Sequence, residues 1–131
     1  MGSRHTKTKS YILFLLYFSA LLYLCFADIH TTKDFIPSLL GIPMDKYAHF
    51  CMFFPFPILG VMAFNRKNFW RTLTFVIIAS IIAAATIEFL QSVLTESRTS
   101  DPYDFVANMA GITSASILTA LYGLFFKGNI K

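Results

Sequence analysis

The feature that most constrains this chain is a set of four long apolar runs separated by short polar segments. The runs cover residues 11–27, 48–64, 72–94 and 105–126, and they contain 17, 17, 23 and 22 residues. A helix that crosses the hydrocarbon core of a bilayer needs about 20 apolar residues, within a range of roughly 17 to 25. Only 14% of the residues are charged, against about 25% in typical soluble domains. The sequence therefore predicts an all-α integral membrane protein, a four-helix transmembrane bundle in which residues 1–131 form one domain.

The basic residues predict how these helices are oriented. Because basic loops tend to stay in the cytoplasm, their positions indicate a multi-pass protein with both termini inside. The same pattern accounts for the net charge of +4, so we expect no nucleic-acid partner. The apolar segment 35–44 is too short to span and is expected at the outer interface. Eight of the eleven basic residues lie before the first run, between the second and third, or after the fourth: Arg4, Lys7, Lys9, Arg66, Lys67, Arg71, Lys127 and Lys131.

Details within the first two runs add three expectations. The basic start and small Ala27 also fit a signal peptide cleaved after that residue, but a retained helix fits the charge alternation better. Pro55 and Pro57 should kink the second helix, because proline removes a helical hydrogen bond. Cys25 and Cys51 show no metal-binding spacing and are expected to be buried free thiols.

Polar residues are predicted to gather at the outer end of the bundle. Glu88 lies 17 residues after Arg71, which is about 25 Å along a helix and close to the outer edge of the core. The stripe that runs from Asp101 through Asn108 to Ala115 follows spacings of three and four, and it falls within an arc of about 80°. Ionisable groups inside a membrane usually mark a functional site. The candidate site residues are Asp45, Lys46, His49, Glu88, Gln91, Arg98, Asp101, Asp104 and Asn108.

Two local signals predict how the fourth helix begins and packs. Asp101 followed by proline is typical of a helix N-terminus. Small residues recur at every fourth position of the third and fourth runs, which lets two helices approach closely in lipid. We therefore expect Glu88 to lie near His49, Arg98 or Asp104, since a lone carboxylate at that depth is costly.

These residues occur in an order that resembles a known family. The chain reads Asp-Lys-x-x-His-Phe from Asp45, Glu-x-x-Gln from Glu88, and Arg-x-x-Asp-x-x-Asp-x-x-x-Asn-x-x-Gly from Arg98. This pattern is similar to that of the VanZ-like family of small bacterial integral membrane proteins, from about Asp45 to Phe126. The family is named for an accessory factor in resistance to teicoplanin, a glycopeptide with a lipid tail. The resemblance implies a cell-envelope role in the bacterial cytoplasmic membrane.

The favoured function is binding of a membrane lipid, a lipid-linked wall precursor or a lipopeptide at the outer leaflet. In this hypothesis Lys46 and Arg98 pair with a phosphate or carboxylate of the ligand. No cofactor and no metal is expected, and the oligomeric state stays open.

Three alternatives remain. In an enzyme that acts on an envelope lipid or wall precursor, His49 would form an acid–base pair with Glu88 or Asp104, or hold a metal with Asp45 and Asp101. In a structural protein, the charges would form a buried ion network. In a proton-coupled transporter, Glu88 would carry the proton.

Overall fold

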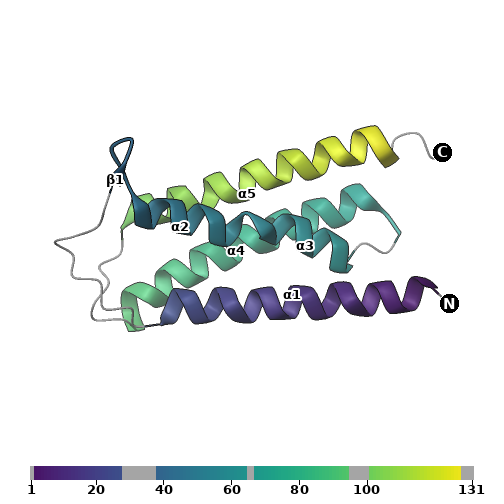
Figure 1. Cartoon of the computed structure of the whole chain (residues 1–131), viewed down its shortest axis with the longest axis horizontal. Helices are drawn as coiled ribbons and strands as arrows, with labels where there is room; N and C mark the ends of the chain where they lie inside the picture. Colours follow the sequence, from purple (N-terminus) through teal and green to yellow (C-terminus); the bar gives the residue numbers. More distant parts are fainter. Residues whose placement is uncertain (1, 28–37, 65–66, 95–100, 128–131) are drawn as a thin grey trace.

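The computed structural model describes residues 2–27, 38–64, 67–94 and 101–127. In this part of the chain the helices lie along one long axis, with both termini at one end (Figure 1). Four stretches are long and apolar enough to cross a membrane: Arg4–Phe26, Met44–Phe64, Phe69–Leu94 and Pro102–Lys127. The predicted all-α four-helix bundle is confirmed. Its elements are α1 (Gly2–Phe26), α2 (Met44–Phe53), α3 (Pro55–Phe64), α4 (Phe69–Leu94), α5 (Pro102–Tyr122) and the π-helix η2 (Gly123–Lys127).

The second span is broken by its prolines, as predicted. Helix α2 ends at Phe53, and α3 begins at Pro55. Proline has no backbone N–H, so carbonyl groups one turn earlier lose their helical partners. At the break the Tyr17 hydroxyl of α1 donates a hydrogen bond to the Met52 carbonyl oxygen. This bond ties α1 to the second span beside the kink.

Small residues allow α5 to lie directly against its neighbours. A Cβ atom on Gly111 would come within 2.5 Å of the Phe50 carbonyl oxygen, so only glycine permits this approach of α5 to α2. Ser80 and Ala84 of α4 and Ala115 of α5 are fully buried. The close packing brings the polar positions of α2, α4 and α5 together at one end.

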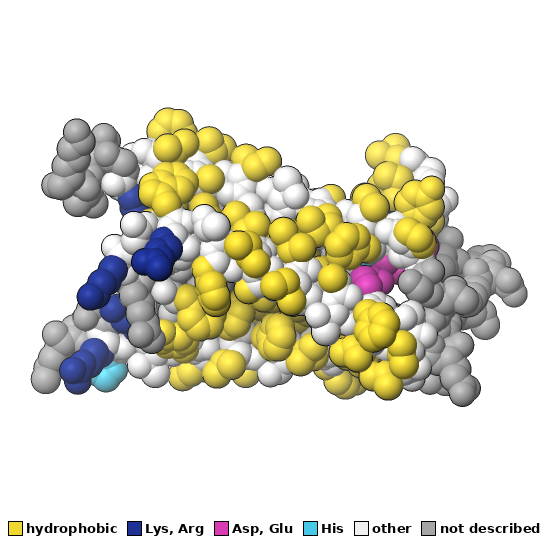
Figure 2. Space-filling model, turned by 180° about the vertical axis from the view of Figure 1, so that it is seen from behind, with side chains coloured by type: hydrophobic (Ala, Val, Ile, Leu, Met, Phe, Trp, Pro, Cys, Tyr) yellow, Lys and Arg dark blue, Asp and Glu magenta, His cyan; other side chains and the backbone are white. Residues whose placement is uncertain are grey.

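The outer surface is that of a membrane protein. Figure 2 shows apolar side chains over the middle of the bundle, lysines and arginines at one end and acidic residues towards the other. Large side chains such as Leu15, Phe75, Phe89 and Ile117 point outwards and are more than half exposed. A soluble monomer does not expose an apolar surface of this extent, whereas lipid tails cover it without cost. The chain is a multi-pass membrane protein.

The expectation that both thiols are buried is wrong for one of them. Cys25 is buried and Cys51 is exposed, and neither forms a disulfide. Helix α2 turns His49 and Phe53 into the bundle. In the sequence Cys51 is two residues from each of them, which corresponds to about 200° around the helix, so its side chain faces outwards.

A short hairpin precedes α2. Strand β1 (Ser38–Leu39) pairs antiparallel with β2 (Ile42–Pro43), and the two turn residues, Leu40 and Gly41, have φ of 55° and 78°. Positive φ at both positions is typical of a two-residue hairpin turn, although leucine rarely adopts it. The hairpin lies at the end opposite the termini (Figure 1). An interfacial location for residues 35–44 stays a prediction, and 35–37 lie outside the described residues.

Candidate functional site

The helices that contribute polar residues have an end on the side of the bundle that carries the hairpin. Helices α2 and α5 begin there, and α4 ends there (Figure 1). The start of α5 is fixed by Asp101, whose Oδ1 accepts a hydrogen bond of 3.0 Å from the Tyr103 backbone N–H. The following Pro102 needs no partner for its nitrogen at this position. The predicted helix start is therefore confirmed.

Lys46 is the centre of an ion cluster between α2 and α5. Its Nζ donates to Asp45 Oδ2 at 3.0 Å, to Asp101 Oδ2 at 2.6 Å and to Asp104 Oδ1. An ammonium group has three donors, so all of them are engaged. The lysine side chain is 13% exposed, whereas those of Asp45 and Asp101 are 36% and 38% exposed. The ammonium is thus covered by carboxylates that face the end of the bundle.

Deeper in the bundle, Asn108 joins His49 to Glu88. His49 Nδ1 lies 3.0 Å from Asn108 Oδ1, and because an amide oxygen only accepts, Nδ1 carries a proton and donates. Asn108 Nδ2 donates to Glu88 Oε1 at 2.8 Å. Glu88 Oε1 also lies 3.7 Å from His49 Nδ1, which confirms the expected approach of the two residues.

Asp104 connects the two groups of polar residues. Its Oδ1 accepts from Lys46, and its Oδ2 lies 3.6 Å from His49 Nε2. The imidazole is therefore placed between two carboxylates, those of Glu88 and Asp104. The described cluster holds more acceptors than donors. Within the described residues, Asp45 Oδ1 is buried and has no hydrogen-bond partner.

Asp101 has a second role besides capping α5. The Lys46 ammonium, which donates a hydrogen bond to it, holds the pKa of this carboxyl below its ordinary value, and the Tyr103 N–H acts in the same direction. Oδ1 accepts the hydrogen bond that caps the helix, and Oδ2 accepts the hydrogen bond from Lys46. Capping and ion pairing are combined in one residue.

Gln91 and Arg98 differ from the other candidates. The Gln91 side chain donates a hydrogen bond of 2.7 Å to the Cys25 carbonyl oxygen, which ties α4 to α1. We interpret Gln91 as a helix-packing residue. Arg98 lies outside the described residues. Sequence reasoning missed the contacts of Gln91 with Cys25 and of Tyr17 with Met52, because a backbone carbonyl acceptor leaves no sequence signal.

The geometry does not suggest a metal centre in the described part of the chain. No group of three or more His, Cys, Asp and Glu side chains there has the arrangement that holds a metal ion. The carboxylates of Asp45, Asp101 and Asp104 instead surround the Lys46 ammonium.

The lowered pKa of Asp101 predicts part of the acid sensitivity. A depressed pKa contributes stability above the unfolded value of about 3.9, and that stability is lost as the pH falls through the lower folded value. Asp101→Asn keeps a good N-cap and removes the charge, so this variant should lose less stability than the native protein as the pH falls from about 5 through the lower folded pKa. Denaturation in mixed micelles measures the difference. Equal losses would contradict the assigned ion pair, and Asp101→Ala, which also lacks the cap, is the control.

Comparison with known proteins places the chain in a family. The family model described as VanZ/LLP1 matches residues 4–125. An uncharacterised protein of Schizosaccharomyces pombe is 33% identical over 88 residues, which cover 67% of this chain and 54% of that protein. The chain thus spans about half the length of this curated relative. No solved structure matches the chain. The family match includes every helix that contributes to the polar cluster, and the chain belongs to the VanZ/LLP1 family.

Proposed function

We propose that the acidic end of this membrane protein binds the headgroup of a lipid-bearing or lipid-linked ligand of the cell envelope. Membership of the VanZ-like family supports a cell-envelope role. Six polar side chains of α2, α5 and the Asp101 cap, together with Glu88 of α4, form one cluster towards the end of the bundle, within reach of a molecule anchored in the adjoining leaflet.

The surplus of acceptors supports this function most directly. Lys46 has no donor left for a phosphate or carboxylate of a ligand, because Asp45, Asp101 and Asp104 use all three. Asp45 Oδ1 is buried and unpaired within the described residues. A buried acceptor without a partner costs roughly 1–3 kcal/mol, which a donating ligand would recover. We therefore propose that the headgroup carries an amine or another hydrogen-bond donor.

The proposed location is the bacterial cytoplasmic membrane, with the acidic end outside and both termini inside. The basic residues support this orientation, because they gather at the end with the termini (Figure 2). A Ser38→Cys variant in a Cys51→Ser background places a thiol on the exposed hairpin. We expect a membrane-impermeant maleimide to label it in intact cells. Labelling that requires permeabilised cells would reverse the orientation.

A resistance assay tests the function in cells. A susceptible bacterial host that expresses the protein should tolerate teicoplanin modestly better, with no change for a glycopeptide that lacks a lipid tail. Asp104→Asn and Glu88→Gln should abolish the shift at unchanged membrane levels, because each removes one charge from the cluster. Lys67→Gln changes one charge at the opposite end and should behave as the native protein does. No shift with either drug would exclude a resistance role for this chain.

Native mass spectrometry of the detergent-purified protein tests binding without relying on resistance. The native chain should retain an envelope lipid or lipid-linked precursor that the Asp104→Asn variant loses. Equal retention by both proteins would contradict the proposed site.

An acid–base enzyme is the second candidate, and the position of His49 favours it. The ring lies between Glu88 and Asp104, with Nδ1 held as a donor by Asn108. A histidine held between carboxylates can take up and return a proton. Incubation with a labelled lipid-linked wall precursor distinguishes the two functions. Turnover that His49→Gln abolishes while binding persists would favour the enzyme.

A further inference from the structure

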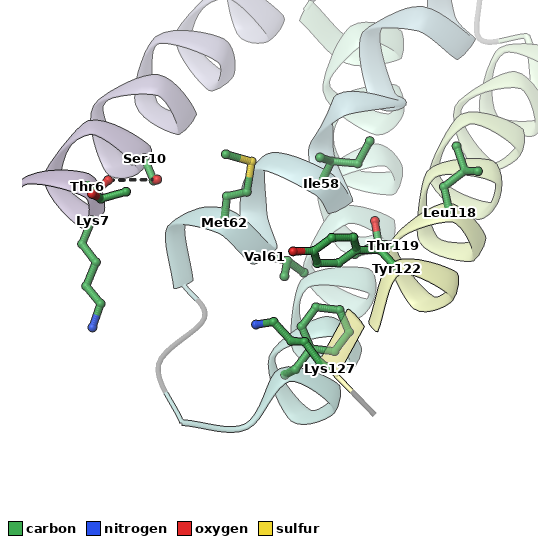
Figure 3. A pocket seen from close by; sticks show the side chains of 11 residues that line it. Thr6, Lys7, Ser10, Ile58, Val61, Met62, Leu118, Thr119, Tyr122 and Lys127 are labelled. Atoms are coloured by element: carbon green, nitrogen blue, oxygen red, sulfur yellow. Dashed lines mark hydrogen bonds between the residues drawn. The ribbon is translucent and has the colours of Figure 1, made fainter. Parts of the chain in front are cut away.

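A second site lies at the other end of the bundle, beside the termini. It is a pocket of about 580 Å³ lined by residues of α1, α3, α5 and η2 (Figure 3), and Phe69 of α4 also belongs to its lining. Small-molecule pockets typically measure about 300–1,000 Å³, so this volume suffices for part of a lipid. None of its lining residues belongs to the acidic cluster.

The pocket has an apolar wall and a basic mouth. Val61 and Met62 of α3 and Leu118 of α5 form the wall, and Met62 and Leu118 are about half exposed. Lys7 of α1 and Lys127 of η2 belong to the lining on its two flanks (Figure 3). Among the described residues, no acidic side chain lines the pocket. A ligand that matches this pattern has an apolar body and an anionic head.

The pocket is not fully enclosed, because Met62 and Leu118 of its wall remain about half exposed. Helix α3 packs against both α1 and α5, which lie on opposite sides of it with little contact between them (Figure 1). An acyl chain can enter laterally between two helices that do not close over it. The apolar wall would not contribute to the binding of a small soluble anion.

Local structure holds one of the lysines in place. Lys127 Nζ lies 4.8 Å from the centroid of the Phe69 ring. A Cβ atom on Gly123 would overlap that ring, so the glycine lets η2 approach it closely. The helix also widens into a π-helix at Gly123–Lys127, a deviation that is frequent at functional sites.

We propose that this pocket binds a phospholipid with an anionic headgroup from the leaflet that surrounds the terminal end. One acyl chain lies along α3 between α1 and α5, and the phosphate is bound by Lys7 and Lys127. Basic pockets between transmembrane helices suit such headgroups. The site is independent of the function proposed for the acidic end.

The single tryptophan of the chain provides the test. Trp70 stands next to the pocket, with its ring centroid 5.2 Å from that of Phe69. We would reconstitute the protein in bilayers that contain increasing fractions of brominated phosphatidylglycerol or brominated phosphatidylcholine and measure quenching of its fluorescence. The anionic lipid should quench at a lower mole fraction than the zwitterionic lipid. Lys7→Gln and Lys127→Gln should each raise its half-quenching fraction about fivefold, since one lysine near a membrane surface contributes roughly 1 kcal/mol.

Matched variants separate the pocket from general surface charge. Lys9→Gln and Lys67→Gln remove the same charge from exposed positions near the same end, outside the lining. They should leave the half-quenching fraction nearly unchanged. Ser10→Phe fills the pocket while both lysines remain, and it should abolish the preference for the anionic lipid. Equal quenching by both lipids, equal effects of all four lysine variants, or displacement of the lipid by inorganic phosphate at constant ionic strength would overturn the proposal.

Discussion

Replacement of Lys46 by methionine is expected to destabilise the protein by about 3 kcal/mol. The substitution keeps much of the apolar stem and removes the ammonium that three carboxylates share. Loss of one partner from a buried ion pair typically costs about 3–5 kcal/mol, because the remaining charge is uncompensated. The lower end applies because two of the carboxylates, Asp45 and Asp101, are more than a third exposed and are partly screened. Unfolding in mixed micelles gives the difference.

This loss of stability should arise from repulsion among the carboxylates that no longer share the ammonium. In a background of Asp101→Asn and Asp104→Asn, Lys46→Met should cost at most about 1 kcal/mol, since the repulsion is gone. Lys67→Met removes an exposed lysine at the other end, and we expect it to be near neutral. If Lys46→Met were as mild as Lys67→Met in the native background, the cluster would not hold α2 to α5.

Much of the fold is predictable from local chemistry. The number of spans follows from the length of the apolar runs. The break at Pro55 follows from the missing N–H of proline, and the start of α5 follows from Asp101 followed by proline. Each of these signals is complete within a few neighbouring residues, so tertiary contacts are not needed to interpret it.

The gathering of His49, Glu88 and Asp104 at one end of the bundle was predictable, but the contacts among the polar residues were not. Helical spacing indicates which residues share a face, and it brought Glu88 and His49 to the same end. It does not give the rotation of one helix against another, which here depends on the contact of Gly111 with the Phe50 carbonyl. For this reason the sequence suggested Lys46 as a group for an anionic ligand, whereas the structure surrounds it with aspartates.

Pattern alone was least informative for features that depend on the backbone of another segment. Gln91 binds the Cys25 carbonyl, and a carbonyl acceptor is present at every position of a chain. The orientation of the helices in the membrane already explained the basic residues near the termini. Nothing in the spacing of these residues indicated that Lys7 and Lys127 flank a common pocket. Such sites emerge only when helices distant in sequence are placed side by side.

Asn108→Leu is expected to have the second large effect, a loss of about 2–4 kcal/mol in stability. Asn108 is fully buried and is the hydrogen-bond bridge between His49 and Glu88. Leucine has a similar size but no polar atoms, so a donor on His49 and an acceptor on Glu88 lose their partner together. Each buried group left unpaired costs roughly 1–3 kcal/mol. Denaturation of the purified variant in mixed micelles measures this loss.

Thr119→Val is the matched control, because it removes a buried hydrogen bond of the same helix. The Thr119 hydroxyl donates to the Ala115 carbonyl within α5, and among the described residues it forms no hydrogen bond to another helix. Its loss should cost less than about 1 kcal/mol. Adding Glu88→Leu to Asn108→Leu removes the unpaired carboxylate and should restore part of the stability, which a double-mutant cycle would show as coupling between the two positions. If Asn108→Leu cost no more than Thr119→Val, Asn108 would not be the residue that joins α2, α4 and α5. An Asn108→Leu protein that still folds would retain Lys46 and its aspartates but lose the bridge between His49 and Glu88. Ligand retention by this variant would show whether the outer ion cluster binds the ligand without that bridge.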